Sequence, residues 1–151
     1  MAHIHEKIDW TVGVFIVYKN RVLIRKHDKY GIWLAVGGHV ELNEDQIEAA
    51  KRECLEEVGL AIKIHNEDEY KEFKKKQKNI PCPAFMNRHF VNQTHEHIDF
   101  IYFATSETDT VVPENETDIW LWLTKEEVVA HPEISDEIKK YAISALETLS
   151  N

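Results

Sequence analysis

The 151-residue sequence predicts an α+β fold in which helices pack on the faces of a mixed β-sheet. Runs rich in Val, Ile and aromatic residues are interrupted by one helical segment, and one or two further helical segments follow near the C-terminal end. The chain is long enough for one domain with a substantial core and too short for two typical domains. We therefore assign residues 1–151 to a single domain.

The N-terminal strands lead to a pair of glycines. Residues 9–18 and 21–25 are rich in strand-forming side chains and are separated by a short polar turn, which predicts a hairpin. A polar connection and a short apolar strand at 32–36 follow. Gly37 and Gly38 come next, and paired glycines permit a tight turn and a close approach of the backbone to a ligand.

A helix is predicted at residues 45–58. Asn43 is a suitable N-cap, and Gly59 stands where helices commonly end in a left-handed residue. Apolar side chains recur at three- and four-residue steps and form one stripe, which consists of Ile47, Ala50, Cys54 and Val58. The helix can therefore pack through this stripe and keep another face for polar residues.

The polar face of this helix carries three carboxylates. Glu53, Glu56 and Glu57 are spaced by three and four residues, so they share one face. Such a cluster repels itself unless a cation joins it, and hard divalent ions such as Mg²⁺ bind through oxygen ligands of this kind. Arg52 lies one turn before Glu56 and can pair with it, and Glu44 precedes the helix, from where it can fold back towards the same ion. We therefore expect a metal site.

The alternative interpretation is that the acids form an ordinary solvated helix face, in an interaction module without nucleotide chemistry. This alternative predicts that no divalent ion binds the helix. The glycines on both sides of the helix and the position of Arg52 favour the metal site, because they supply the structural context that such a motif needs.

The second half of the chain predicts four strands and one or two helices. Strand-like runs occupy residues 60–64, 84–91, 97–104 and 118–123. Trp120 and Trp122 alternate along the last run and predict one well-packed sheet face. Thr124 is expected to cap a short helix, and Ser135 begins a final helix with an apolar stripe.

Composition excludes several classes of protein. The formal net charge of −9 argues against sequence-independent nucleic-acid binding, and we interpret the basic run at 70–78 as solvated. Cys54 and Cys82 form neither a metal-ligand spacing nor a secreted disulfide framework, which fits a reducing cytoplasm. The sequence contains no apolar run long enough to span a bilayer and no apolar signal core, so we expect no membrane role.

Residues 38–60 resemble the Nudix box, the signature of hydrolases that cleave nucleoside diphosphates linked to another moiety. The matching residues are Gly38, Glu44, Arg52, Glu53, Glu56, Glu57, Gly59 and Leu60. Cys54 departs from the pattern, which has an aliphatic residue there. A buried free cysteine behaves as a small hydrophobe, so this departure affects packing more than chemistry. The resemblance implies an α/β/α sandwich around a mixed sheet.

The resemblance also implies roles for the site residues. Glu53 and Glu57 are the expected principal Mg²⁺ ligands, and Mn²⁺ is an alternative ion. Glu56 is expected to be a ligand or the base that positions water, and Arg52 is expected to orient the acids. The backbone at Gly37 or Gly38 would supply a further ligand or a phosphate contact. These residues would together cleave a phosphoanhydride.

Nudix enzymes often recruit one more acid from a later loop. The candidates here are Glu96, Glu107, Glu114 and Glu116. We prefer Glu116, because it closes the acidic loop just before the Trp120 strand. His95 and His97 would share a face on a strand, but with no third ligand at zinc-like spacing we expect them to line the substrate cleft or to have no role.

The substrate is expected to be a small nucleotide. Some Nudix subfamilies that prefer ADP-ribose or diadenosine polyphosphates carry a Pro or a Tyr a short way after the box, and residues 74–78 contain neither, which favours a nucleoside triphosphate. The alternatives are an ADP-ribose or nucleotide-sugar pyrophosphatase and a non-catalytic regulatory domain. Trp33, Phe85 and Tyr102 are available to stack on a base. A homodimer is one possible oligomeric state, and the sequence does not distinguish it from a monomer, because a strand at a dimer interface and a strand in the core have the same apolar pattern.

Overall fold

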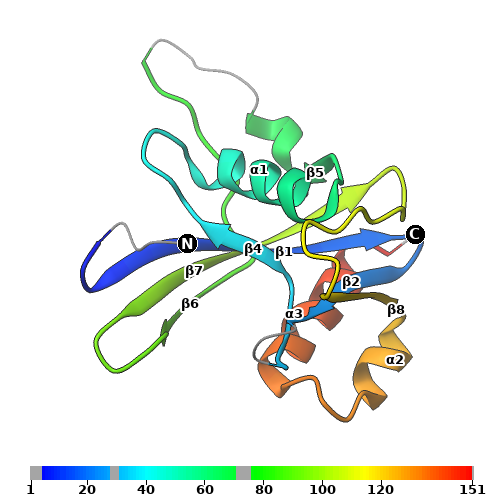
Figure 1. Cartoon of the computed structure of the whole chain (residues 1–151). Coiled ribbons are helices and arrows are strands. Elements are labelled where there is room, and N and C mark those ends of the chain that lie inside the picture. Colours follow the sequence, from blue (N-terminus) through cyan, green and yellow to red (C-terminus); the bar gives the residue numbers. More distant parts are fainter. Residues whose placement is uncertain (1–4, 28–30, 71–75, 151) are drawn as a thin grey trace.

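A mixed β-sheet lies between helices in the computed structural model, which describes residues 5–27, 31–70 and 76–150. Helix α1 covers one face of the sheet and α3 covers the other (Figure 1). The predicted α/β/α arrangement is therefore confirmed. No helix within the described residues is long and apolar enough to cross a membrane.

The strands and helices follow one another as the sequence predicts. The described strands are β1 Ile8–Tyr18, β2 Arg21–Lys26, β3 Trp33–Leu34, β4 Val36–His39, β5 Ile62–Ile64, β6 Phe85–Phe90, β7 Glu96–Ser106 and β8 Ile119–Leu123. The helices are α1 Gln46–Val58, α2 Lys125–Ala130 and α3 Asp136–Thr148, with a 3₁₀ turn at Glu67–Tyr70. The expected single strand at 32–36 is divided into β3 and β4, and only part of the basic run at 70–78 lies within the described residues.

Strand β1 is the centre of the sheet. It pairs in parallel with β7 over nearly its whole length, from Ile8 opposite Glu96 to Val17 opposite Thr105. On its other side it pairs antiparallel with β4 near its start and with β2 near its end. The strand is buried on both faces, since Phe15 packs in the core under α3 and Val14 packs in the core under α1.

Helix α1 begins at a capping box. The Asp45 side chain accepts a hydrogen bond from the Glu48 N–H, and the Glu48 side chain accepts one from the Asp45 N–H. The prediction that Asn43 caps the helix is wrong, because Asn43 lies outside the helix in a left-handed conformation, with φ of 73°. The helix ends at Gly59, whose φ is 67° as expected for a left-handed cap. The predicted apolar stripe packs against the sheet.

The last strand packs against the core under α1, and the last helix contributes side chains to the core on the other face of the sheet. Trp120 and Trp122 are half-buried against the core under α1, which confirms the packed face expected for them. Thr124 and Ser135 cap α2 and α3 through their hydroxyl oxygens, as predicted. Cys54 is buried in the α1 core and Cys82 is exposed, and both are free thiols.

Candidate metal and substrate site

Arg52 connects the acids of α1 to the strand that precedes them. Its Nε and Nη2 donate to the two carboxylate oxygens of Glu44 at 3.1 and 2.7 Å. Its Nη1 donates to Glu53 at 3.0 Å and to Glu56 at 3.2 Å, and its Nη2 also donates to the His39 carbonyl oxygen at 2.9 Å. The hydrogen bonds to Glu44 and Glu53 hold the pKa of Arg52 above its usual range. Arg52 therefore orients the acids, and Glu44 binds Arg52 with both of its oxygens.

Glu53 and Glu57 are a buried pair of carboxyl groups. Their side chains are 4% and 13% exposed. Burial raises the pKa of Glu53 and raises the pKa of Glu57 to about 8, against the opposing charge of Arg25 and with a further contribution from Glu53. Within the described residues, Glu57 Oε2 is buried without a hydrogen-bond partner, and Arg25 Nη1 lies 3.7 Å away. Two crowded carboxylates with an unsatisfied oxygen fit a divalent cation, which would favour their charged forms.

The glycine pair allows α1 to approach β4 closely. A Cβ atom at Gly38 would lie 2.2 Å from Glu53 Oε1, and one at Gly37 would lie 2.2 Å from the Val12 carbonyl oxygen. A hydrogen bond to the Gly37 backbone also opposes the rise in the pKa of Glu57. The backbone of the neighbouring strand therefore requires glycine at position 37, whereas a side chain at position 38 would displace the carboxylate of Glu53.

Replacing Gly38 with alanine is expected to weaken Mg²⁺ binding roughly tenfold while the fold survives, because the end of the Glu53 side chain must move out of its place. The matched variant is Gly37→Ala, whose methyl group meets backbone and is expected to lower the melting temperature instead. Isothermal titration with Mg²⁺ and thermal melting separate the two effects. Unchanged Mg²⁺ affinity in Gly38→Ala would contradict this interpretation.

The metal-free protein is expected to lose stability as the pH rises from about 4.5 to about 8. The folded-state pKa of Glu57, about 8, lies above the ordinary value of 4.5, so the folded protein binds this proton more tightly than the unfolded chain. The resulting stability is fully present below about pH 4.5 and is lost as the pH passes through 8. Thermal melting of metal-free protein measures the slope, and Glu57→Gln should flatten it. An equal slope in that variant would remove Glu57 as its source.

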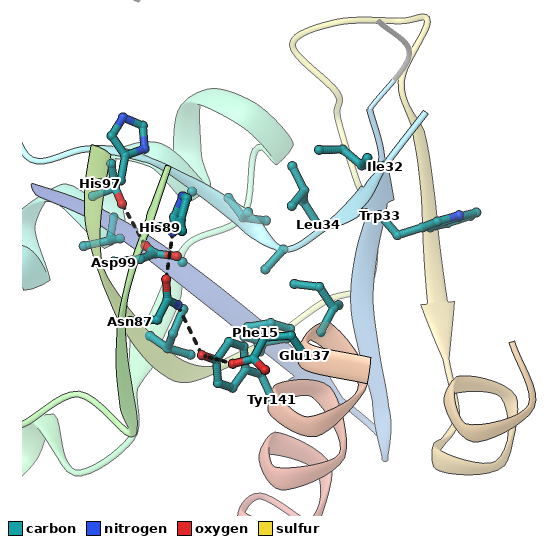
Figure 2. Close-up of a pocket in the computed structure, with 18 of the residues that line it drawn as sticks. Phe15, Ile32, Trp33, Leu34, Asn87, His89, His97, Asp99, Glu137 and Tyr141 are labelled. Carbon is teal, nitrogen blue, oxygen red and sulfur yellow. Dashed lines mark hydrogen bonds between the residues drawn. The ribbon is translucent and has the colours of Figure 1, made fainter. Parts of the chain in front are cut away.

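A pocket of about 720 Å³ opens on the α3 face of the sheet, and Gly37 and Gly38 form part of its wall. Figure 2 shows the apolar side chains of Ile32, Trp33 and Leu34 on one side and polar side chains on the opposite side. The volume lies within the range that small-molecule sites occupy. The pocket and the acids of α1 therefore meet at the same glycine pair, which lies within strand β4 and does not form the tight turn that the sequence allowed.

The polar side of the pocket is a hydrogen-bonded chain. Asn87 Nδ2 donates to the Tyr141 hydroxyl at 3.2 Å, and that hydroxyl donates to Glu137 at 2.8 Å. His89 Nδ1 and Asn87 Oδ1 lie 2.7 Å apart. His97 also lines the pocket, and burial together with the neighbouring histidines lowers its pKa to about 4. The polar side of the pocket can therefore offer hydrogen-bond donors and acceptors to a ligand whose other side packs against Ile32, Trp33 and Leu34.

The other predicted residues differ in their positions relative to the buried acids. Glu56 is half-exposed beside Arg52, and Glu116 is exposed in the turn before β8. Of the expected stacking residues, Trp33 lines the pocket. Phe85 packs on the core under α3, and Tyr102 is buried under α1, where its hydroxyl donates to the Pro81 carbonyl oxygen. The part played by Glu56 and Glu116 stays a prediction.

Two site residues were missed by the sequence reasoning. Arg25 Nη1 lies 3.1 Å from Asp118 Oδ2 and 3.7 Å from Glu57 Oε2, so it joins β8 to the buried carboxyl pair. The Asp118 side chain is 5% exposed, and Asp118 directly precedes β8. A charged residue within the apolar strand β2 was the available signal for Arg25. The antiparallel pairing of β2 with β8, which brings Asp118 near, has no local signal.

Comparisons with known proteins agree with this geometry. The model of the NUDIX domain matches residues 7–145. The crystal structure of a NUDIX-family hydrolase from Clostridium perfringens is 34% identical with a TM-score of 0.83, and the match covers 93% of this chain and 97% of that chain. No functionally curated protein matches the chain.

Two more distant structures share the fold. The MutT NUDIX hydrolase from Burkholderia pseudomallei is 18% identical with a TM-score of 0.67, covering 96% of this chain and 100% of that chain. An Ap4A hydrolase from C. elegans is 22% identical with a TM-score of 0.64, covering 94% and 95%. The chain belongs to the Nudix hydrolase family.

Proposed function

We propose that this protein is a Mg²⁺-dependent pyrophosphohydrolase that cleaves the diphosphate linkage of a nucleoside triphosphate or a related nucleotide. The observation that carries the proposal is that Gly37 and Gly38 belong both to the wall of the pocket and to the contact with the buried acids of α1. A ligand in the pocket would thus have its phosphates next to Glu53 and Glu57. The apolar side chain of Trp33 suits a base or sugar at the other end.

The residues present fit the cation that this chemistry needs. Glu53 and Glu57 would hold Mg²⁺, and Mn²⁺ would bind through the same oxygen ligands. The bound ion would neutralise diphosphate oxygens and lower the pKa of water. Arg52 keeps Glu53 and Glu56 in fixed orientations through its hydrogen bonds. Glu56 is solvent-accessible and is proposed to orient water, and Glu116 is proposed as a further acid from the loop before β8.

The surroundings support a nucleotide as the ligand. The pocket combines one apolar wall with a polar chain built on Asn87 and Tyr141, and hydrogen bonding to a buried polar group is what gives such sites their selectivity. Two free cysteines are consistent with a reducing compartment, and we propose a cytoplasmic location.

The test is a panel of substrates supplied with Mg²⁺ and then with Mn²⁺. It contains the common ribo- and deoxyribonucleoside triphosphates, ADP-ribose, nucleotide sugars and diadenosine polyphosphates, and the products are separated to show which phosphate bond is cleaved. Release of pyrophosphate from a triphosphate, absent in a Glu53→Gln control, is the expected result. Nucleotide binding without turnover of any compound would instead indicate a regulatory Nudix domain and would overturn the proposal.

A further inference from the structure

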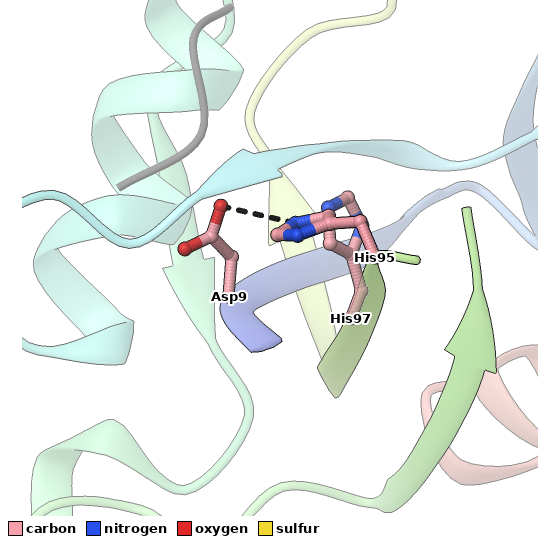
Figure 3. A group of neighbouring side chains, drawn as sticks. All are labelled: Asp9, His95 and His97. Atoms are coloured by element: carbon pink, nitrogen blue, oxygen red, sulfur yellow. Dashed lines mark ion pairs between the residues drawn. The ribbon is translucent and has the colours of Figure 1, made fainter. Parts of the chain in front are cut away.

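A second group of metal-binding side chains lies outside the acids of α1. Asp9 Oδ2 is 3.3 Å from His95 Nε2 and 3.3 Å from His39 Nε2. Ligand atoms of Asp9, His95 and His97 all lie within 4.8 Å of one another, and Figure 3 shows the carboxylate facing the two imidazoles. One carboxylate and several imidazoles are the ligands of a transition-metal ion.

The sheet fixes this group in place. Parallel pairing puts Asp9 of β1 directly opposite His97 of β7. His95 precedes His97 by two residues, and its ring packs edge-on against that of His97 with the ring centres 5.4 Å apart. Strand β4 brings His39 from the other side of β1, and its ring centre lies 4.9 Å from that of His97. Asp9, His39 and His97 therefore stand on three adjacent strands, and His95 lies directly before the first residue of β7; strands are rigid supports for a site.

The outer contacts orient the two innermost side chains. His95 Nδ1 lies 3.0 Å from the Glu6 carbonyl oxygen, so its Nε2 faces Asp9. Asp9 Oδ1 accepts a hydrogen bond from the His5 N–H at 2.7 Å, so its Oδ2 faces the imidazoles. A ligating histidine typically donates its second ring N–H to a backbone carbonyl in this way, and that bond fixes the tautomer.

The side chains of Asp9 and His95 are both deeply buried. Asp9 is 1% exposed and His95 is 3% exposed. A buried carboxylate is unfavourable unless positive charge and directed polar contacts surround it. The Asp9 and His95 pair supplies one such contact, and a bound cation would supply a stronger one to Asp9 and all its imidazole neighbours at once.

We propose that Asp9, His95 and His97, with His39 as the fourth ligand, bind a transition-metal ion of the Zn²⁺ class. Bond lengths of about 2.1 Å place tetrahedral ligand atoms roughly 3.4 Å apart, which the two Asp9 contacts already match. The ring of His97, whose ligand atom lies within 4.8 Å of those of Asp9 and His95, would move inward to complete the set. Imidazole ligands select this ion over Mg²⁺, so the site is chemically distinct from the Glu53 and Glu57 pair. The ion would tie β1, β4 and β7 together.

The test uses the full-length protein after removal of metal by a chelator. Titration with Co²⁺ should produce the visible absorption of a tetrahedral Co²⁺ centre with one equivalent bound, and Zn²⁺ should abolish this absorption by displacement. Zn²⁺ should also raise the melting temperature, because it binds the folded state alone. The proposal is overturned if the wild-type protein shows neither the absorption nor the shift.

Variants locate the ion. His95→Gln and Asp9→Asn are each expected to weaken Co²⁺ binding by at least about 100-fold, whereas His65→Gln, at an exposed histidine, should bind as the wild type does. Glu57→Gln should also keep the absorption, which separates this site from the proposed Mg²⁺ site. Unchanged binding in folded His95→Gln protein, or loss of the absorption in Glu57→Gln, would overturn the assignment to Asp9 and the histidines.

Discussion

Replacing Glu57 with glutamine is expected to lower kcat/KM for nucleotide hydrolysis by about 10²–10³-fold while the protein stays folded. The amide keeps the size of the side chain but cannot offer an anionic oxygen to a cation. It also removes one of two carboxyl groups that are buried together, and burial is the main cause of the raised pKa of Glu57. The metal-free variant should therefore melt at a higher temperature than the wild type above about pH 8.

The combination of lower activity and higher stability is the signature of a functional carboxylate that destabilises its own fold. Steady-state kinetics with Mg²⁺ and thermal melting without it measure the two parts. Glu126→Gln, at an exposed acid of α2, is the matched control and should change neither. Wild-type turnover in Glu57→Gln would exclude Glu57 from the chemistry, whatever the melting temperature.

Replacing Arg52 with lysine is expected to lower kcat/KM roughly 10- to 100-fold and to reduce the free energy of unfolding by about 1–3 kcal/mol. Lysine keeps the positive charge but cannot donate at once to Glu44, Glu53 and the His39 carbonyl oxygen, as the guanidinium does. The loss should appear in kcat more than in KM, because Arg52 holds the acids and is not among the residues that line the pocket.

Arg21→Lys is the control for this prediction. Arg21 pairs with Asp109 at 3.0 Å on the surface, where the two side chains are 34% and 45% exposed, so its replacement should change stability by less than about 1 kcal/mol. Denaturant unfolding and initial-rate kinetics compare the two variants. Equal and small effects in both would show that the hydrogen bonds of Arg52 do not organise the acids.

Signals within one helix allowed much of the site to be predicted. The spacing of four residues between Arg52 and Glu56 predicted a contact that is present, at 3.2 Å. The prediction that Asn43 caps the helix was wrong, although the sequence contains the signal for the true cap. Asp45 is followed three residues later by Glu48, and this pair forms a capping box. Local periodicity thus predicts the helix, and the capping box in its first turn marks where it starts.

Contacts between distant strands could not be predicted in the same way. The expectation that His95 and His97 have no third ligand was wrong in its premise, because Asp9 reaches them through the parallel pairing of β1 with β7. The link from Arg25 to Asp118 depends likewise on which strands become neighbours. Register between remote strands is set by tertiary packing, and the residues at either end carry no local mark of it.

The parallel pairing of β1 with β7 also constrains how the chain is made. During synthesis β1 emerges from the ribosome about ninety residues before β7. Until β7 has been made, β1 lacks its longest ladder of backbone hydrogen bonds. Helix α1 packs on β1, and the glycine pair of β4 is hydrogen-bonded alongside it. A nascent chain that stops before residue 106 would consequently expose an apolar strand prone to aggregation, and the Nudix box would have no stable platform until β7 is complete.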